Sequence, residues 1–246
     1  MSVDPKNVRA SLDKHILADG FDPVMDMEKS HGSWLIDQRD GTKFLDMFSM
    51  FASGAVGYNH PKIVANRDRL AISAQNKPTL SDIYNVHYAE FLDTFSKSAI
   101  PDYLPHTFFI EGGSLAVENA LKVAFDWKVR KNLSNGKGEK GSKIIHFKEA
   151  FHGRSGYTLS LTNTTDPRKT MYFPIFDWPR IINPKLSFPI TDHVIAEVEK
   201  NEKLAVEQIK AAISKNPYDI AGLIIEPIQG EGGDNHFRDE FFIALR

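Results

Sequence analysis

The feature that most constrains the fold of this 246-residue chain is an alternation of short apolar runs with longer helical patterns after residue 101. Runs with the length of buried strands occur at residues 107–110, 143–147 and 221–225. Amphipathic stretches extend from Leu115 to Lys131 and from Asp192 to just before Pro217. Strands that alternate with helices of this length predict an α/β fold, with a central, mostly parallel sheet flanked by helices.

Turns divide the part of the chain before residue 101. Two short apolar runs, 34–37 and 43–46, are joined by a turn that contains Gly41, and this pattern predicts a β-hairpin. Helices are expected at about residues 62–75 and 87–98, the second because its apolar residues have helical spacing.

The composition excludes several classes of protein. The chain has no cysteine, which rules out a disulfide scaffold, cysteine-ligated zinc and a thiol nucleophile, and suits a reducing cytoplasm. The net charge is -2 and the basic residues are scattered, so we expect neither nucleic acid nor a membrane as partner. Residues 1–14 lack the apolar run of a signal peptide. A soluble, cytoplasmic protein is therefore predicted.

A glycine-containing turn, residues 111–114, joins the expected strand 107–110 to the helix that follows it. Glycines allow a sharp turn and a close approach to a ligand, and the free N–H groups at the start of the helix point to the same place. With the hydroxyl of Ser114, these groups would form a phosphate cup. The alternative is a simple chain reversal in which Ser114 caps the helix. The spacing matches neither a P-loop nor a dinucleotide fingerprint.

A second segment follows the expected strand 143–147 and places an aromatic ring, an imidazole and a guanidinium within four residues. Phe151, His152 and Arg154, at the carboxyl end of a strand, suit a site that holds a flat ring and an anion. The alternative is a loop in which Phe151 packs in the core and Arg154 pairs with a surface carboxylate.

A third segment, residues 225–234, contains three glycines and three carboxylates directly after an apolar strand. The spacing of Glu226, Glu231, Asp234 and His236 matches no EF-hand and no paired-histidine zinc motif, so no metal site is assigned. A flexible loop is the competing interpretation of this segment.

The three segments occur together, in order, with the spacing of class III aminotransferases, which belong to fold type I of the pyridoxal-phosphate enzymes. The resemblance also includes residues 32–46 and 57–61. Within the class, residues 111–122, 151–162 and 176–180 look most like those of L-lysine 6-aminotransferases (lysine ε-aminotransferases). Ornithine- and GABA-type relatives more typically show a Ser-Gly-Ser-Glu-Ala run at the phosphate turn, and this chain does not.

The resemblance implies how the cofactor, pyridoxal 5'-phosphate, would be held. Gly113 and Ser114 would bind its phosphate, and Phe151 and His152 would contact the rest of it. Phe151 would stack on the pyridine ring, whose electron-sink character drives the chemistry.

The resemblance also implies the substrates, L-lysine and 2-oxoglutarate. Arg154 would bind the α-carboxylate of lysine as a planar fork. Glu231 would mask a second arginine, which is freed when 2-oxoglutarate arrives. The implied reaction moves the ε-amino group of lysine to 2-oxoglutarate and gives L-glutamate and 2-aminoadipate 6-semialdehyde. Another class III ω-amino acid aminotransferase, of the ornithine, acetylornithine or GABA type, is the alternative.

The family pattern requires more than these 246 residues contain. No Asp-Glu-(Val/Ile)-Gln stretch is present, and no lysine lies at the family's Schiff-base position, so no catalytic residue is assigned. We therefore expect an incomplete type I fold truncated at its C-terminal side, by nature or by an artefact of the gene record. Residues 1–60 would be an N-terminal segment of the small domain with the β-hairpin, and residues 61–246 a partial large cofactor domain.

The full-length protein is expected to be a homodimer, because sites of this family borrow residues from the partner subunit. The chain alone is expected to be catalytically incomplete. A non-catalytic product that persists as a binding or dimerisation partner is the alternative outside the enzymes.

Overall fold

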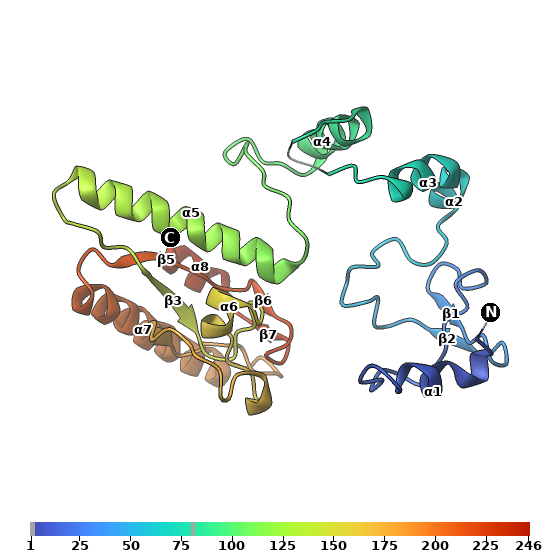
Figure 1. The fold of residues 1–246 in the computed structure, drawn as a ribbon. Helices are drawn as coiled ribbons and strands as arrows, with labels where there is room; N and C mark the ends of the chain where they lie inside the picture. Colours follow the sequence, from blue (N-terminus) through green and yellow to red (C-terminus); the bar gives the residue numbers. More distant parts are fainter. Residues whose placement is uncertain (1–2, 80–81) are drawn as a thin grey trace. The chain divides into compact units, whose positions relative to one another are not determined.

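The computed structural model describes residues 3–79 and 82–246. Two compact units, Met1–Pro105 and His106–Arg246, divide the chain and are drawn in Figure 1. The domain boundary predicted after residue 60 falls inside the first unit. It refers to the domains of the complete protein and stays a prediction.

Within the described residues, the first unit contains the predicted hairpin, a short 3₁₀ segment and four α-helices. Its elements in chain order are η1 (Pro5–Asn7), α1 (Val8–Leu12), β1 (Trp34–Ile36), β2 (Lys43–Leu45), α2 (Pro61–Ala65), α3 (Arg67–Gln75) and α4 (Val86–Ser98). Strands β1 and β2 pair antiparallel, with Trp34 opposite Leu45, which confirms the hairpin. The helix expected at 62–75 is interrupted at Asn66, whose backbone ends α2 and precedes α3.

The second unit has the predicted α/β organisation. Its elements are α5 (Gly113–Ser134), β3 (Lys143–Phe147), α6 (Gly156–Leu161), η2 (Pro167–Lys169), β4 (Arg180–Ile181), α7 (Asp192–Lys215), β5 (Ile220–Leu223), β6 (Ile228–Gln229), β7 (Asn235–His236) and α8 (Asp239–Leu245). The central sheet has the order β4-β3-β5, and both pairs are parallel. Strands β6 and β7 form a separate antiparallel pair.

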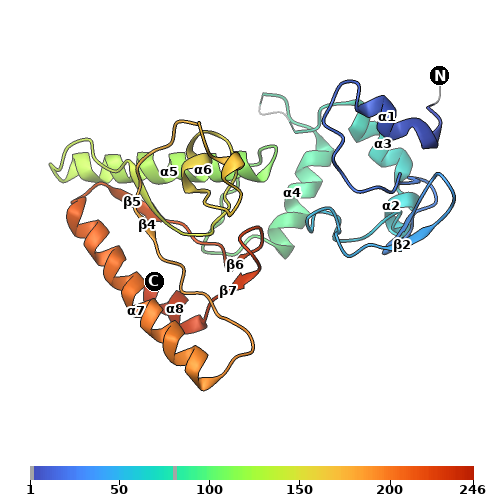
Figure 2. The same ribbon diagram turned by 90° about the horizontal axis from the view of Figure 1, so that it is seen from below.

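Helices cover both faces of this sheet. Successive side chains of a strand point to opposite faces, and Ile144 and Ile145 of β3 accordingly belong to different clusters. Ile144 packs with Leu121 of α5, whereas Ile145 packs with Ala205 of α7 and Phe241 of α8. Figures 1 and 2 show α5 and α7 on opposite sides of the sheet.

One predicted strand is not formed. Residues 107–110 have no strand assignment, and Phe108 is 72% exposed. A strand needs a neighbouring strand to take up its backbone hydrogen bonds, and none of the sheets within the described residues includes this run. The apolar pattern predicted a strand at residues 107–110, but such a pattern does not show whether a neighbouring strand is present to pair with it.

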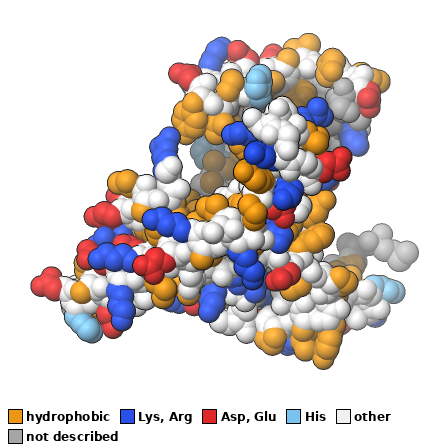
Figure 3. All heavy atoms as spheres, turned by 90° about the vertical axis from the view of Figure 1, so that its left-hand side faces the viewer, with side chains coloured by type: hydrophobic (Ala, Val, Ile, Leu, Met, Phe, Trp, Pro, Cys, Tyr) orange, Lys and Arg blue, Asp and Glu red, His pale blue; other side chains and the backbone are white. Residues whose placement is uncertain are grey.

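The surface carries charges of both signs. On the face drawn in Figure 3, Lys and Arg side chains are interspersed with Asp and Glu rather than gathered in one patch. Among the residues described, no helix combines the length and the apolar character needed to cross a membrane.

Candidate functional site

Five of the six predicted site residues lie around one cavity. This cavity of about 660 Å³ is lined by Gly113 and Ser114 from the start of α5 and by Phe151, His152 and Arg154 from the loop after β3. The two segments are far apart in the sequence, so the cavity exists because the first turn of α5 lies beside the carboxyl end of β3. Glu231 does not line it.

The start of α5 is held to the loop by a cluster of hydroxyl groups. Ser114 Oγ lies 2.5 Å from Ser155 Oγ and 2.9 Å from Thr158 Oγ1. Glu118, one helical turn after Ser114, is 8% exposed. One of its carboxylate oxygens, Oε1, accepts hydrogen bonds from Ser155 Oγ and from Thr158 N, each at 2.9 Å. These contacts fix the position of the Ser114 hydroxyl at the edge of the cavity.

Two glycines make this close approach feasible. Gly112 is the N-cap of α5 and has a φ of 88°, which favours glycine. Because Gly112 holds the N-cap position, the capping role considered for Ser114 is not the one that the structure shows. Gly153 has a φ of 124°, and a Cβ added there would lie 2.2 Å from Ser114 Oγ. Any side chain at residue 153 would therefore displace Ser114.

The ring of His152 has a buried nitrogen that, within the described residues, lacks a hydrogen-bond partner. His152 is 8% exposed, and this nitrogen is Nε2. Burial lowers the pKa of His152 to about 4, so the ring is neutral at neutral pH. A buried nitrogen left unpaired beside a cavity is the arrangement expected where a ligand supplies the missing partner.

The backbone of Phe151 is hydrogen-bonded to the carboxylate of Glu226. The N–H of Phe151 donates to Glu226 Oε1 at 2.7 Å. Burial raises the pKa of Glu226 above its usual value. Glu226, which follows the strand β5, therefore connects the loop of Phe151 to the third predicted segment.

Arg154 is exposed and free to bind an anion. In the part of the chain that the structure describes, its guanidinium forms no hydrogen bond and no ion pair. The alternative in which Arg154 pairs with a surface carboxylate is therefore not observed.

Glu231 is joined to the site through a lysine that the sequence did not single out. Its carboxylate forms an ion pair with Lys169, the last residue of η2. Lys169 Nζ in turn lies 6.0 Å from the centroid of the Phe151 ring. Lys169 and Glu231 are 62 positions apart in the sequence, and a local sequence pattern does not predict such a contact.

A buried polar network anchors the loop that carries Glu231. Gln229 is fully buried, and its Oε1 accepts from Asn183 Nδ2 at 2.7 Å and from Asn235 Nδ2 at 2.9 Å. Glu149 Oε2 accepts from both of these amides and from Lys185 Nζ. The loop after β5 is therefore ordered by specific hydrogen bonds, which contradicts its interpretation as flexible.

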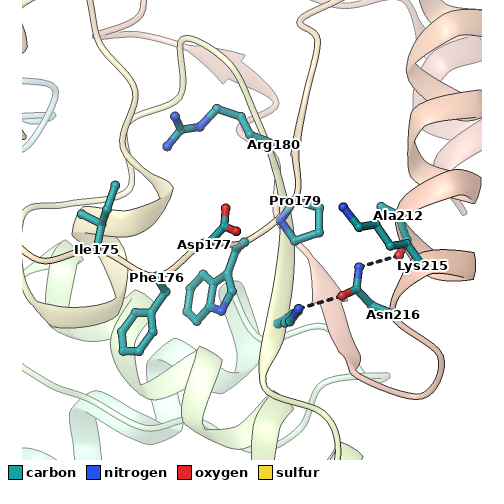
Figure 4. A pocket seen from close by; sticks show the side chains of 10 residues that line it. Ile175, Phe176, Asp177, Pro179, Arg180, Ala212, Lys215 and Asn216 are labelled. Atoms are coloured by element: carbon teal, nitrogen blue, oxygen red, sulfur yellow. Dashed lines mark hydrogen bonds between the residues drawn. The ribbon is translucent and has the colours of Figure 1, made fainter.

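A second cavity, of about 510 Å³, lies between residues 175–180 and the C-terminal end of α7 (Figure 4). Lys143 Nζ there donates to Asn216 Oδ1 at 2.7 Å, and Asn216 Nδ2 donates to the carbonyl oxygen of Ala212 at 2.9 Å. None of the predicted site residues lines this cavity, so we assign the functional site to the first one. Among the residues described, no cluster of side chains has the composition of a metal site.

The start of α5, the glycine turn before it and the aromatic loop after β3 together line one cavity of an α/β protein. The family model described as "Aminotransferase class-III" matches residues 17–246, and the chain belongs to this family.

Known relatives agree with this assignment. Over 246 residues the chain is 48% identical to the L-lysine-epsilon aminotransferase of Amycolatopsis lactamdurans. The matched region is 99% of this chain and 54% of that protein. A solved structure of lysine aminotransferase from M. tuberculosis superposes with a TM-score of 0.94 at 47% identity, covering 99% of this chain and 56% of that one. The 4-aminobutyrate aminotransferase of Emericella nidulans is 32% identical, over 98% of this chain and 52% of that protein. The chain thus spans about half the length of the curated relatives it matches.

Proposed function

We propose that the complete protein transfers the ε-amino group of L-lysine to 2-oxoglutarate with pyridoxal 5'-phosphate as cofactor, giving 2-aminoadipate 6-semialdehyde and L-glutamate. The observation that carries the proposal is the 48% identity to L-lysine-epsilon aminotransferases, against 32% to a 4-aminobutyrate aminotransferase.

The residues of the cavity fit the cofactor. Gly113 and Ser114 supply N–H and hydroxyl donors at the positive end of α5 for a phosphate. Phe151 offers an apolar face for the ring, and the unpaired Nε2 of His152 lies at the same cavity. When bound, the cofactor supplies an aldehyde and an electron sink for the carbon that carries the amine.

Arg154 would orient lysine in this site. Its free guanidinium can take the α-carboxylate of lysine with two parallel hydrogen bonds. Binding the substrate by this end leaves the ε-amine at the far end of an extended chain, and positions it for reaction. We assign no proton-transferring residue within these 246 residues.

Assays with the complete protein test the proposal. Lysine, ornithine and 4-aminobutyrate are each offered with 2-oxoglutarate, and glutamate is measured as the common product. We expect kcat/KM for lysine to exceed that for the other two amines at least about tenfold, the discrimination that ~1.4 kcal/mol provides. Preference for ornithine or 4-aminobutyrate would replace the proposal by one of the other class III activities.

A second assay addresses the 246 residues by themselves. We propose that they do not turn over lysine, because none of their lysines is assigned as the residue that reacts with the cofactor. Turnover of lysine by this polypeptide would contradict that statement. A folded, inactive polypeptide that binds the cofactor would instead support a non-catalytic binding product.

We further propose a homodimer located in the cytoplasm. The homodimer is supported by the family membership, and a cytoplasmic location by the absence of cysteine from the sequence. Light scattering on the complete protein gives its mass in solution, and twice the chain mass is the expected value.

A further inference from the structure

We propose that Thr158 is a positioning residue for the phosphate of the cofactor. Its hydroxyl group takes over from Ser114 as the donor to Ser155, so that Ser114 can turn its own proton toward the phosphate. The inference deepens the proposed function and rests on its cofactor, pyridoxal 5'-phosphate. Thr158 is fully buried in α6, and the residues that line the cavity do not include it. Its effect on the ligand therefore passes through Ser114.

Three hydroxyl groups form a triangle beside the cavity. Ser114 Oγ lies 2.5 Å from Ser155 Oγ and 2.9 Å from Thr158 Oγ1. The third side, between Ser155 Oγ and Thr158 Oγ1, is 3.0 Å long. Each hydroxyl group has one proton to donate. Three protons therefore suffice for the three contacts only if none of them is donated outside the triangle.

The proton of Ser155 is donated outside the triangle. Ser155 Oγ donates to Glu118 Oε1 at 2.9 Å, and the same carboxylate oxygen accepts from Thr158 N. The short contact between Ser114 and Ser155 must then use the proton of Ser114. In this arrangement Ser114 has no proton left for a phosphate oxygen, which needs a donor.

Thr158 can release the proton of Ser114. Its Oγ1 lies at nearly the same distance from Ser114 Oγ and Ser155 Oγ, 2.9 and 3.0 Å. Rotation of the Thr158 hydroxyl proton is therefore enough to change its acceptor from one oxygen to the other. When Thr158 donates to Ser155, the proton of Ser114 is free to point into the cavity, and the heavy atoms stay where they are.

A backbone donor keeps the Ser114 oxygen paired during this exchange. The N–H of Ser155 donates to Ser114 Oγ at 3.3 Å and to Thr158 Oγ1 at 3.1 Å. Ser114 Oγ therefore still accepts a hydrogen bond after the Thr158 proton has turned away, and no buried acceptor is left unpaired. Gly153 encloses the group closely, because a Cβ added there would lie 2.8 Å from Thr158 Oγ1.

The competing explanation is that the Thr158 hydroxyl only stabilises the start of α6, where it accepts the N–H of Ser155. Ser160, on the same helix, provides a matched comparison. It is 1% exposed, and its hydroxyl oxygen accepts from Phe176 N at 2.8 Å. Ser160 is thus a buried hydroxyl of α6 that serves a different segment, and its removal tests what loss of structure alone does.

The test titrates the complete, cofactor-free protein with pyridoxal 5'-phosphate and with pyridoxal, the same ring without the phosphate. Thr158→Val keeps the shape of the side chain and removes its hydroxyl group. It should raise the Kd for pyridoxal 5'-phosphate about tenfold and change that for pyridoxal less than about twofold, as one lost hydrogen bond behind a charged group predicts. Thr158→Ser should restore the wild-type ratio of the two Kd values, and Ser160→Ala should leave this ratio unchanged.

Ser155→Ala separates the direction of the protons from a structural role. This variant removes the internal acceptor of the Ser114 proton, so the Kd for pyridoxal 5'-phosphate should fall about threefold. A triangle that served only stability would instead bind the cofactor less tightly in both Ser155→Ala and Thr158→Val. Phosphorus NMR of the cofactor-saturated protein gives a second readout. The phosphate signal should be displaced in Thr158→Val and lie at the wild-type position in Ser160→Ala.

Equal losses of affinity for both ligands in Thr158→Val, or a raised Kd for pyridoxal 5'-phosphate in Ser155→Ala, would overturn the inference. Thr158→Ala, which also lacks the hydroxyl group, should give the same result and replaces Thr158→Val if that variant does not fold. A wild-type protein that uses another amine but not lysine would overturn only the proposed reaction, because these titrations contain no amine. A wild-type protein that binds pyridoxal as tightly as pyridoxal 5'-phosphate would overturn the inference together with the phosphate site.

Discussion

The two sides of the cavity are built in different ways. On the side that we propose for the cofactor phosphate, called the phosphate side, Ser114 is fixed by hydroxyl groups at 2.5 and 2.9 Å, and Glu118, one helical turn later, is almost fully buried. On the side that we propose for the substrates, called the substrate side, Arg154 is exposed and, within the described residues, unpaired, while the side chains of Lys169 and Glu231 are 28% and 33% exposed. Under the proposed function, a rigid side suits the cofactor phosphate, which takes no part in the chemistry, and an adjustable side suits two substrates of different charge.

The largest effect is expected on the adjustable side. Arg154→Ala should lower kcat/KM for lysine about a hundredfold to a thousandfold, because loss of a charged, two-point contact to a carboxylate costs about 3–4 kcal/mol. The Kd for the cofactor should stay within about twofold. Arg154→Lys should recover only part of the activity, since an ammonium lacks the planar fork. A similar loss of cofactor affinity in Arg154→Ala would show that the two sides are not separable.

The next effect belongs to the rigid side. Gly153→Ala should weaken cofactor binding about thirtyfold or more, since the new Cβ would lie 2.2 Å from Ser114 Oγ and the φ of 124° is strained for alanine, together about 2–3 kcal/mol. The matched control is Gly156→Ala, where the nearest atoms to the new Cβ are the carboxylate oxygens of Glu118 at 3.8 Å. Absorption titrations of the two variants with cofactor measure the difference. Equal cofactor affinities of Gly153→Ala and Gly156→Ala would mean that the phosphate side can adapt to an added side chain and is not rigid.

Glu118 tests what makes that side rigid. Glu118→Leu should lower the free energy of unfolding by about 2–3 kcal/mol, because Thr158 N and Ser155 Oγ lose their common acceptor in a buried place. Glu118→Gln should cost less than about 1 kcal/mol, since one amide oxygen can replace the single Oε1 that accepts both bonds. Urea unfolding of both variants decides the matter. Equal losses would indicate that the charge of Glu118, and not its acceptor oxygen, holds the two segments together.

The sequence predicted those parts of the fold that depend on local spacing. The helix that became α5, the strand β3 and the hairpin of β1 and β2 all occur where periodicity placed them, within a few residues. The strand expected at 107–110 failed because strand formation depends on a distant neighbour that periodicity does not describe. The break at Asn66 was missed for a different reason. The helical spacing of apolar residues continues from α2 into α3, although the backbone of Asn66 between them is not helical.

The candidate site divides in the same way. The sequence could single out five residues that line the cavity, because each lies in a short segment at the end of a regular element: Gly113, Ser114, Phe151, His152 and Arg154. Lys169 was missed because its contact joins residues 62 positions apart. Glu118 was also missed, although its place four residues after Ser114 puts both side chains on one face of a helix. That spacing was the one available signal.

His152, which also lines the cavity, gives the smallest expected effect. Its folded pKa of about 4 is below the value of about 6.5 for an unfolded chain, so between these values the unfolded state binds a proton that the folded state excludes. Stability should therefore be full above pH 6.5 and fall as the pH decreases toward 4. Between pH 7 and pH 5 this group accounts for about 2 kcal/mol, at about 1.4 kcal/mol per pH unit below 6.5. Burial also lowers the pKa of His146 to about 4, and this residue adds a similar amount.

Urea unfolding of cofactor-free protein at pH 7 and pH 5 measures this loss of stability. Between the two pH values, His152→Gln should lose about 2 kcal/mol less than the wild type. If His152→Gln and the wild type showed the same pH dependence, the His152 ring would be accessible to water in the folded protein, and it would belong to the exposed, substrate side of the cavity.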